Sequence, residues 1–181
     1  MAPLLLLAVV ALAGWTYCPR CRSELERGRG SVQCPVCGFR EYASSVPTAS
    51  ALVVDDEGRV LLARRAGEPD AGKWDLPGGF LDEGEHPREG LVRELREETG
   101  LEVEPGAFFD VVMDRYGDGP DAHATLNLYW LARVVSGVQQ AADDVAELRW
   151  FRRGELPGSD ELAFANNERV LSAWRARNEH A

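Results

Sequence analysis

Three glutamates near the middle of the chain have the residue type and the spacing of a site for a divalent cation. Glu94, Glu97 and Glu98 stand at positions i, i+3 and i+4, so a helix would place their carboxylates close enough to converge. Like charges at these spacings repel by roughly 0.2–0.5 kcal/mol per pair, and the last turn of a helix adds the negative end of its dipole. Oxygen ligands in this arrangement favour Mg²⁺ or Mn²⁺, which keep water in their remaining positions and bridge to substrate phosphates.

The element that must position these glutamates is a helix of about three turns. Pro87 suits the first helical position, because its φ is fixed and its missing N–H is not needed there, and Gly100 suits the residue after the last turn. Leu91, Val92 and Leu95 recur at spacings of three and four. They form one apolar stripe, which predicts that the helix packs against a sheet.

A solvated helix whose arginines neutralise the glutamates is the alternative, and a helix taken alone would favour it. The wider pattern G-x5-E-x7-R-E-U-x-E-E-x-G-U, in which U is a bulky aliphatic residue, favours the metal site instead. The chain meets all of its specified positions, namely Gly79, Glu85, Arg93, Glu94, Leu95, Glu97, Glu98, Gly100 and Leu101.

This pattern resembles the signature of the Nudix hydrolase family, and the resemblance covers about residues 46–178. It implies Mg²⁺-dependent hydrolysis of a nucleoside diphosphate linked to another moiety. It also implies an α/β fold, an α/β/α sandwich with a mixed β-sheet. Strand-like segments around two helices agree with that architecture.

The resemblance implies roles for the residues that match the pattern. Glu94, Glu97 and Glu98 would hold the divalent ions that polarise the phosphates and activate a water molecule. Glu98 is the first candidate to accept the proton of that water, and Glu97 is the second. Arg93 would orient a glutamate through a bidentate contact. Glu85 would either pair with Arg93 or complete the outer shell of the site.

Further residues are candidates for contacts with substrate. Gly78 and Gly79 would let the backbone approach a phosphate closely, although adjacent glycines commonly mark a plain turn. Asp143, Asp144 and Glu147 precede a predicted strand in the region where relatives supply another acid or recognise the base. Solvated acidic residues are the alternative for these three.

Two Cys-x-x-Cys pairs, separated by twelve residues, occur near the start of the chain at Cys18, Cys21, Cys34 and Cys37. Four thiolates in this arrangement close a tetrahedral Zn²⁺ site and leave no open coordination position, so the ion would be structural. Two disulfides or a redox pair are the alternatives. The segment is similar to a zinc ribbon, and it is too small to fold without its ion.

The chain of 181 residues is long enough for one medium domain and a small module, and 45% hydrophobic residues are ample for a core. We expect an apolar tail at residues 1–14, the zinc ribbon at 15–42 and the hydrolase domain at 46–178. The tail can be read as a signal segment, as a loosely held tail or as the result of a start codon placed too early. A reduced metal-thiolate cluster and a nucleotide substrate favour the cytoplasm.

Other elements of the hydrolase domain are predicted from alternation, turn residues and helical periodicity. Two strands separated by a tight turn are predicted to form a hairpin, at Ala49–Val54 and Arg59–Arg64. Later segments predict three strands and a second amphipathic helix, at Phe108–Arg115, Ala124–Val135, Glu147–Phe151 and Asn166–Arg177.

The identity of the substrate is less sharply defined. Residues 72–79, Gly-Lys-Trp-Asp-Leu-Pro-Gly-Gly, are similar to the corresponding stretch of ADP-ribose pyrophosphatases and MutT-type enzymes. ADP-ribose or a related dinucleotide is therefore the first candidate substrate, and a nucleoside triphosphate is the second. A zinc ribbon ahead of the pattern is also found in NADH pyrophosphatases, but their downstream Ser-Gln motif has no counterpart, since residues 101–135 contain neither Ser nor Gln.

The partner expected from these residues is a small nucleotide. A formal net charge of −10 argues against a protein that grips nucleic acid through its phosphates. We expect no membrane partner, because the apolar run at the start of the chain is too short to span a bilayer, and a homodimer is left open. A hypothesis from another class is a sensor that binds nucleotide without cleaving it. The intact set of Glu94, Glu97 and Glu98 weighs against a sensor, which does not need all of the metal ligands.

Overall fold

The structure is a computed structural model that describes residues 12–117 and 122–177. The chain divides into two compact units, one made of residues 1–46 with 115–124 and the other of residues 47–114 with 125–181. Most of the predicted apolar tail lies outside the described residues. The predicted domain boundaries at 15–42 and 46–178 stay predictions.

The first unit contains a three-stranded antiparallel sheet of β1 (Glu26–Gly28), β2 (Ser31–Gln33) and β3 (Arg40–Tyr42). Its strands are three residues long, and Val32 in the central strand is the buried apolar side chain of this sheet, 1% exposed. So small an apolar core does not stabilise a fold unaided, which makes a further cross-link necessary.

The four cysteines supply the groups for that cross-link. The sulfurs of Cys18 and Cys37 lie 3.5 Å apart, and those of Cys21 and Cys34 lie 3.4 Å apart. All four sulfur atoms lie within 4.8 Å of one another, and all four cysteines are free of disulfides. The structure therefore brings together the cluster that the spacing of the two pairs predicts.

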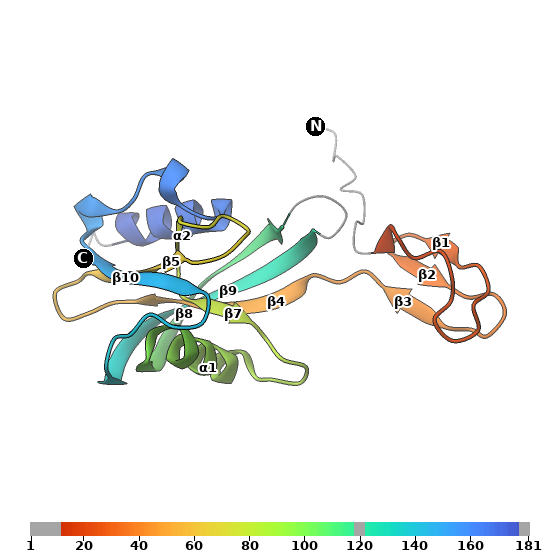
Figure 1. The fold of residues 1–181 in the computed structure, drawn as a ribbon, viewed down its shortest axis with the longest axis horizontal. Coiled ribbons are helices and arrows are strands. Elements are labelled where there is room, and N and C mark those ends of the chain that lie inside the picture. The colour runs from red at the N-terminus through yellow and green to blue at the C-terminus, as the bar shows by residue number, and fades with distance from the viewer. Residues whose placement is uncertain (1–11, 118–121, 178–181) are drawn as a thin grey trace. The chain divides into compact units, whose positions relative to one another are not determined.

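The second unit is built from two sheets and two helices. The strand orders are β7-β4-β9-β8 and β10-β5-β6, and the helices α1 and α2 lie on opposite sides of the sheets (Figure 1). A parallel bridge between Trp74 and Leu162 adds to the antiparallel pairs. This is the predicted α/β/α sandwich. Its elements are β4 (Val46–Val53), β5 (Val60–Arg65), β6 (Trp74–Asp75), β7 (Gly78–Phe80), α1 (Pro87–Thr99), β8 (Leu101–Tyr116), β9 (His123–Gly137), β10 (Val145–Phe151), the short 3-10 helices η3 (Arg153–Glu155) and η4 (Ser159–Glu161), and α2 (Ala165–Ala176). No helix in the described ranges is long and apolar enough to cross a membrane.

Each helix covers its own apolar core. Because side chains alternate along a strand, Leu52 of β4 faces the α2 side while Ala51 and Val53 face the α1 side. The α2 core includes Val170, Leu171 and Trp174, which confirms the predicted apolar face of that helix. The α1 core includes Leu91 and Leu95, both 0% exposed.

The boundaries of α1 agree with the prediction from Pro87 and Gly100. The side chain of His86 accepts a hydrogen bond from the backbone N–H of Arg88 at 3.2 Å and caps the first turn. Gly100 adopts φ 68°, and its N–H donates to the carbonyl of Arg96 at 3.0 Å. The helix that carries the glutamates is thus fixed at both ends and along its buried face.

The predicted hairpin of residues 49–54 and 59–64 is wrong. β4 and β5 belong to different sheets, and only an isolated bridge between Val54 and Val60 joins them at the turn. The carboxylate of Asp55 accepts from the backbone N–H groups of Glu57 and Arg59, so the turn itself is tight, as predicted. The two strands are largely buried on both faces, and each finds its partners elsewhere in the chain.

Candidate functional site

Arg93, on the exposed side of α1, connects several carboxylates. Its Nε and Nη2 donate to the two carboxylate oxygens of Glu85, each at 2.8 Å. Its Nη1 donates to Glu94 at 2.7 Å and to Glu97 at 3.2 Å, and Nη2 also reaches the carbonyl of Phe80 at 3.1 Å. Arg93 therefore forms the bidentate contact with Glu85, and it ties β7 and the loop before α1 to the helix.

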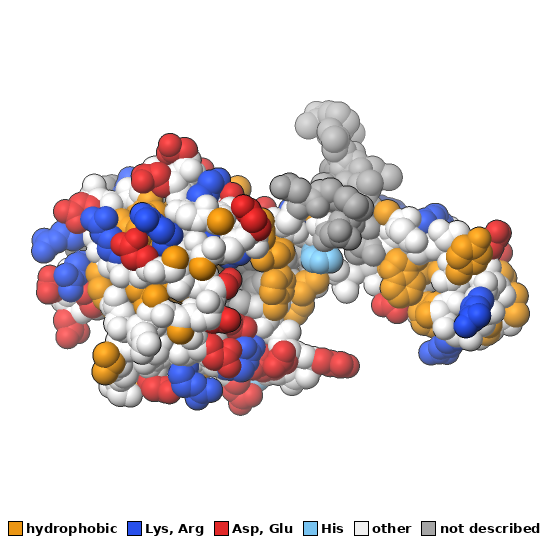
Figure 2. Space-filling view, in the orientation of Figure 1, with side chains coloured by type: hydrophobic (Ala, Val, Ile, Leu, Met, Phe, Trp, Pro, Cys, Tyr) orange, Lys and Arg blue, Asp and Glu red, His pale blue; other side chains and the backbone are white. Residues whose placement is uncertain are grey.

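The pair of Arg93 and Glu85 stays charged over a wide pH range. Hydrogen bonds from Arg93 and from the backbone N–H of Asp82 hold the pKa of Glu85 at about 2. The same hydrogen bond to Glu85 raises the pKa of Arg93. Acidic side chains also gather around the loop that leads into α1 on the face shown in Figure 2.

Glu98 lies in a different environment, although it belongs to the same helix. The residue is 8% exposed, and its Oε2 accepts a hydrogen bond from the backbone N–H of Gly78 at 2.9 Å. Burial raises the pKa of Glu98 well above its usual range, the amide of Gly78 opposes that shift, and the charges of Asp144, Asp75 and Glu94 add to it. A negative charge at Glu98 therefore lacks compensation.

The adjacent glycines are required by the packing of β7 against β4 and α1. Gly78 has φ 140°, and a Cβ there would lie 2.3 Å from the carbonyl oxygen of Ala49. A Cβ on Gly79 would lie 2.5 Å from the carboxyl carbon of Glu94. Gly79 thus makes room for Glu94, and Gly78 makes room for the backbone of β4. Contact of Gly78 and Gly79 with substrate stays a prediction.

Asp144 lies beside the buried glutamate. The backbone N–H of Ala142 donates to the carbonyl of Glu98 at 3.1 Å and anchors the loop before β10 to the end of α1. A small hollow is lined by Glu98, Asp144 and Gly78 together with Asp75 and Arg65. The predicted site residue Asp144 therefore lines the same hollow as Glu98.

Glu147 is placed differently. It lies within β10 and forms an ion pair with Arg64 at 3.2 Å, with 47% of its side chain exposed. The residues that line the hollow around Glu98 do not include Glu147. Its predicted role in binding substrate has no support from this geometry and stays a prediction.

The structure adds residues to the site that sequence reasoning missed. Asp75 accepts from Nδ2 of Asn167 at 2.8 Å and lies 3.4 Å from Nη1 of Arg65. Burial raises the pKa of Asp75 to about 6, against the opposing effect of Asn167 and Arg65. The sequence did contain a signal for this residue, because Asp75 lies in the stretch Trp74–Gly79, which ends in the two glycines.

Asn166, the first asparagine of α2, carries a buried acceptor without a partner. Its backbone N–H donates to Asp114 at 2.9 Å, and the residue is 8% exposed. Within the described ranges, its Oδ1 has no hydrogen-bond partner. A buried acceptor of this kind is costly unless a ligand donates to it, so Asn166 is a candidate for substrate recognition.

The predicted convergence of the three glutamates on one ion stays a prediction. In the part of the chain that the structure describes, their oxygens are not among the groups whose ligand atoms all lie within 4.8 Å of one another. Arg93 holds Glu94 and Glu97, whereas Glu98 is directed to Gly78.

The chemistry of the donors fits a hard divalent cation. The hollow is lined by the carboxylates of Glu98, Asp75 and Asp144 and by the side chain of Arg65. Burial is the main cause that raises the pKa of Glu98 and of Asp75. A divalent cation would compensate these charges and would favour oxygen ligands over nitrogen or sulfur. The predicted metal ligands Glu94, Glu97 and Glu98 all project from the last two turns of α1, at the edge of this acidic group.

Comparison with known proteins gives consistent matches. The NUDIX domain family matches residues 44–174. The chain is 31% identical over 126 residues to an ADP-ribose pyrophosphatase of Methanocaldococcus jannaschii, which covers 70% of this chain and 72% of that protein. It is 40% identical over 102 residues to a putative 8-oxo-dGTP diphosphatase 2 of Mycobacterium tuberculosis, covering 56% and 70% of the two chains.

A solved structure resembles most of the chain. The crystal structure of a NUDIX hydrolase from Nitrosomonas europaea superposes with a TM-score of 0.75 at 25% identity, and the match covers 92% of this chain and 93% of that one.

We predict that Arg93→Lys raises the pKa of Glu85 from about 2 towards its ordinary value near 4.5, because lysine cannot bind both carboxylate oxygens. Since the folded-state pKa of Glu85 is depressed, its stabilising contribution is present above about pH 4.5 and is lost as the pH falls to about 2. The parent should therefore be more stable than the variant near neutral pH, with a difference that shrinks on acidification. Denaturant unfolding at several pH values measures this.

Arg96→Lys is the matched control, because Arg96 lies on the same helix and its nearest carboxylate, that of Glu102, is 3.9 Å away between two exposed side chains. Arg96→Lys should change neither the pKa of Glu85 nor the pH dependence of the free energy of unfolding. A pKa of Glu85 that stays near 2 in Arg93→Lys would show that the arginine fork does not hold this carboxylate.

Proposed function

The chain belongs to the NUDIX hydrolase family, and on that premise we propose that it hydrolyses the pyrophosphate bond of a nucleoside diphosphate linked to another moiety, with ADP-ribose or a related dinucleotide as substrate. The observation that carries the proposal is the buried carboxylate of Glu98, which accepts a hydrogen bond from the backbone N–H of Gly78 and lines one hollow with the carboxylates of Asp75 and Asp144. Such a set suits a divalent cation that also binds substrate phosphates.

Glu94, Glu97 and Glu98 would hold the cation, and Mg²⁺ and Mn²⁺ both fit these oxygen ligands. When bound, the ion would polarise the phosphates and lower the pKa of a bound water. Arg93 would keep Glu94 and Glu97 in position, since it already contacts both carboxylates. Glu85 would act through Arg93 as its bidentate partner and not by direct contact with the cation.

Glu98 is our candidate for the group that accepts the proton of the attacking water. Its carboxylate is buried and is held by one hydrogen bond from Gly78, so its second oxygen can face the reacting atoms. Glu97 is the second candidate, but its side chain is 46% exposed and is engaged by Arg93. In ADP-ribose, water would attack one phosphorus, the bridging P–O bond would break, and AMP and ribose 5-phosphate would leave.

The choice of substrate rests on relatives and on one buried side-chain acceptor. The relative from Methanocaldococcus jannaschii is an ADP-ribose pyrophosphatase, which supports ADP-ribose. The buried, unpaired Oδ1 of Asn166 could accept a hydrogen bond from an exocyclic amine of a base. A nucleoside triphosphate is the second candidate, because another relative is a putative 8-oxo-dGTP diphosphatase. The cytoplasm is the compartment that a nucleotide substrate and four free thiols favour.

A substrate panel with Mg²⁺ tests the proposal. ADP-ribose, NADH, diadenosine polyphosphates, dGTP and 8-oxo-dGTP would each be incubated with the full chain, and the products would be resolved by ion-exchange chromatography. We expect the highest kcat/KM for ADP-ribose, with AMP and ribose 5-phosphate as products. A higher kcat/KM for a nucleoside triphosphate, with release of pyrophosphate, would move the assignment to the second candidate. Tight binding without turnover of any nucleotide would indicate a sensor.

Glu98→Gln should lower kcat by roughly 10²–10⁴ and change KM less, because it removes the proposed base and keeps the size of the side chain. The folded protein should be no less stable, since the substitution removes a buried charge. Arg96→Ala, on the exposed side of α1, is the control and should leave kcat unchanged. A Glu98→Gln enzyme as fast as the parent at saturating Mg²⁺ would move the assignment to Glu97.

We also propose that the four cysteines bind one structural Zn²⁺, because four thiolates fill a tetrahedral site. Cys34, with 0% exposure, is the most deeply buried of them. Cys34→Ser should lower the zinc content and unfold residues 15–42, while hydrolysis persists; elemental analysis, amide NMR and activity measure these three effects. Ser31→Ala in β2 is the control. Protein purified under reducing conditions without zinc would contradict the assignment.

A further inference from the structure

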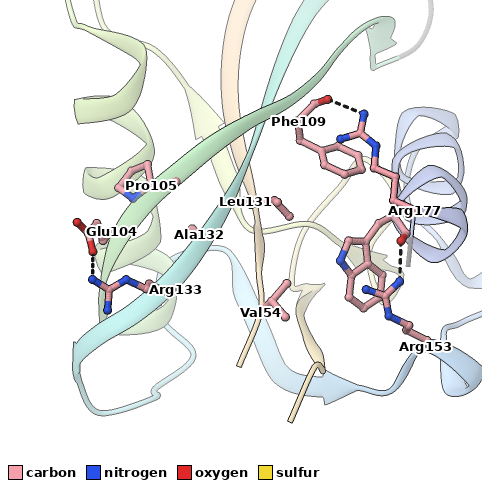
Figure 3. A pocket seen from close by; sticks show the side chains of 11 residues that line it. Val54, Glu104, Pro105, Phe109, Leu131, Ala132, Arg133, Arg153 and Arg177 are labelled. Atoms are coloured by element: carbon pink, nitrogen blue, oxygen red, sulfur yellow. Dashed lines mark hydrogen bonds and ion pairs between the residues drawn. The ribbon is translucent and has the colours of Figure 1, made fainter. Parts of the chain in front are cut away.

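A second hollow lies beside the C-terminal end of α2, on the α2 side of the sheet (Figure 3). Its volume is about 600 Å³, within the range of roughly 300–1,000 Å³ that is usual for small-molecule sites. Val54 and Leu131 lie in its centre, Pro105 and Arg133 on one side, and Arg153 and Arg177 on the other.

This hollow is separate from the one around Glu98, and the two share no lining residue. Helix α2 runs from one hollow to the other. Asn167 in its first turn donates a hydrogen bond to Asp75, which lines the Glu98 hollow. Trp174 and Arg177 follow seven and ten residues later. At 1.5 Å per residue they lie about 10 and about 15 Å further along the helix direction.

Arg153 of η3 and Arg177, which follows α2, are each held in place by an aromatic ring and a backbone carbonyl. The guanidinium of Arg153 lies 3.9 Å from the ring centroid of Trp174, and Nη1 donates to the carbonyl of Trp174 at 2.7 Å. The guanidinium of Arg177 lies 3.9 Å from the ring centroid of Phe109, and Nη2 donates to the carbonyl of Phe109 at 3.1 Å. Each guanidinium is thus preorganised as a flat, charged surface.

Neither guanidinium is neutralised within residues 12–117 and 122–177. Arg133, on the opposite side, forms an ion pair with Glu104. Arg153 and Arg177 form no ion pair there, and their hydrogen bonds go to main-chain carbonyls. Two fixed cations on one wall of an apolar hollow are complementary to an anion that carries a ring.

We propose that this hollow binds a small anion with a planar aromatic ring, of the size of a nucleoside monophosphate, at a site distinct from the catalytic one. The anionic group would contact the edge of the Arg177 guanidinium, with Arg153 further along the same side of the hollow. The ring would lie over the apolar centre at Val54 and Leu131 and against the flat guanidinium wall. Fixed guanidinium groups lower the ordering cost of binding, which favours a ligand that meets both at once.

AMP is the probe for this site, with adenosine and inorganic phosphate as separate tests of ring and charge. The full chain labelled with ¹⁵N would be titrated, and the indole N–H signal of Trp174 and the amide signal of Gly78 would be followed as reporters of the two hollows. We expect AMP to shift the Trp174 signal in a saturable manner, and adenosine or phosphate to do so at least tenfold more weakly. Shifts confined to Gly78 would overturn the proposal.

Arg177→Gln should weaken AMP binding at the Trp174 reporter about tenfold or more, because it removes one charge-assisted contact. Arg175→Gln is the matched control, since Arg175 is exposed on the same last turn and does not line the hollow. Arg153→Lys keeps the positive charge near the end of α2 but loses the flat fork, and it should also weaken binding. Unchanged affinity in Arg177→Gln, or in Arg153→Lys if the first variant does not fold, would overturn the proposal.

The outcome does not depend on the proposed reaction. The signal of Trp174 reports binding and not hydrolysis, so a chain that fails to cleave ADP-ribose can still bind AMP here. Conversely, an active enzyme whose Trp174 signal does not respond to AMP would retain its proposed function and lose this site.

Discussion

Glu98 lies almost fully buried at the end of α1, with its carboxylate on the amide of Gly78, and a negative charge in that place is costly unless a cation compensates it. Other features of the hydrolase unit surround this constraint. The glycines of β7 allow the close approach of the backbone to Ala49 and Glu94. The loop before β10 is anchored on the end of the same helix and brings Asp144 to the hollow.

The acidic groups near α1 fall into two sets with different electrostatics. Arg93 pairs with the first set, which is Glu85, Glu94 and Glu97, and keeps the pKa of Glu85 at about 2. The second set is Glu98 with Asp75 and Asp144, and burial raises the pKa of Glu98 and of Asp75. Arg93 thus fixes the geometry of the helix surface. In the second set Arg65 pairs with Asp75 and Asp144, and a divalent cation can compensate the negative charge that remains.

Local signals predicted much of this arrangement, and contacts between distant segments account for what was missed. Pro87 and Gly100 predicted the ends of α1, because caps depend on neighbouring residues. The cysteine pairs predicted their cluster, since each pair forms within four residues. The tight turn before β5 is also set by neighbouring residues. The strands that pair with β4 and β5 come from distant parts of the chain, so the hairpin prediction failed. Asp75 and Asn167 meet across 92 positions of the chain, and no sequence period indicates that contact.

The central claim is that Glu98 carries an uncompensated charge that a divalent cation relieves. Its direct test is a ¹³C NMR titration of the Glu98 side-chain carboxyl, in the absence of metal and at saturating Mg²⁺. Without metal, the pKa should lie well above the ordinary value for glutamate of about 4.3. With Mg²⁺, the carboxyl should be ionised at neutral pH and should titrate at a lower pH than before. An ordinary pKa without metal that Mg²⁺ leaves unchanged would contradict the account.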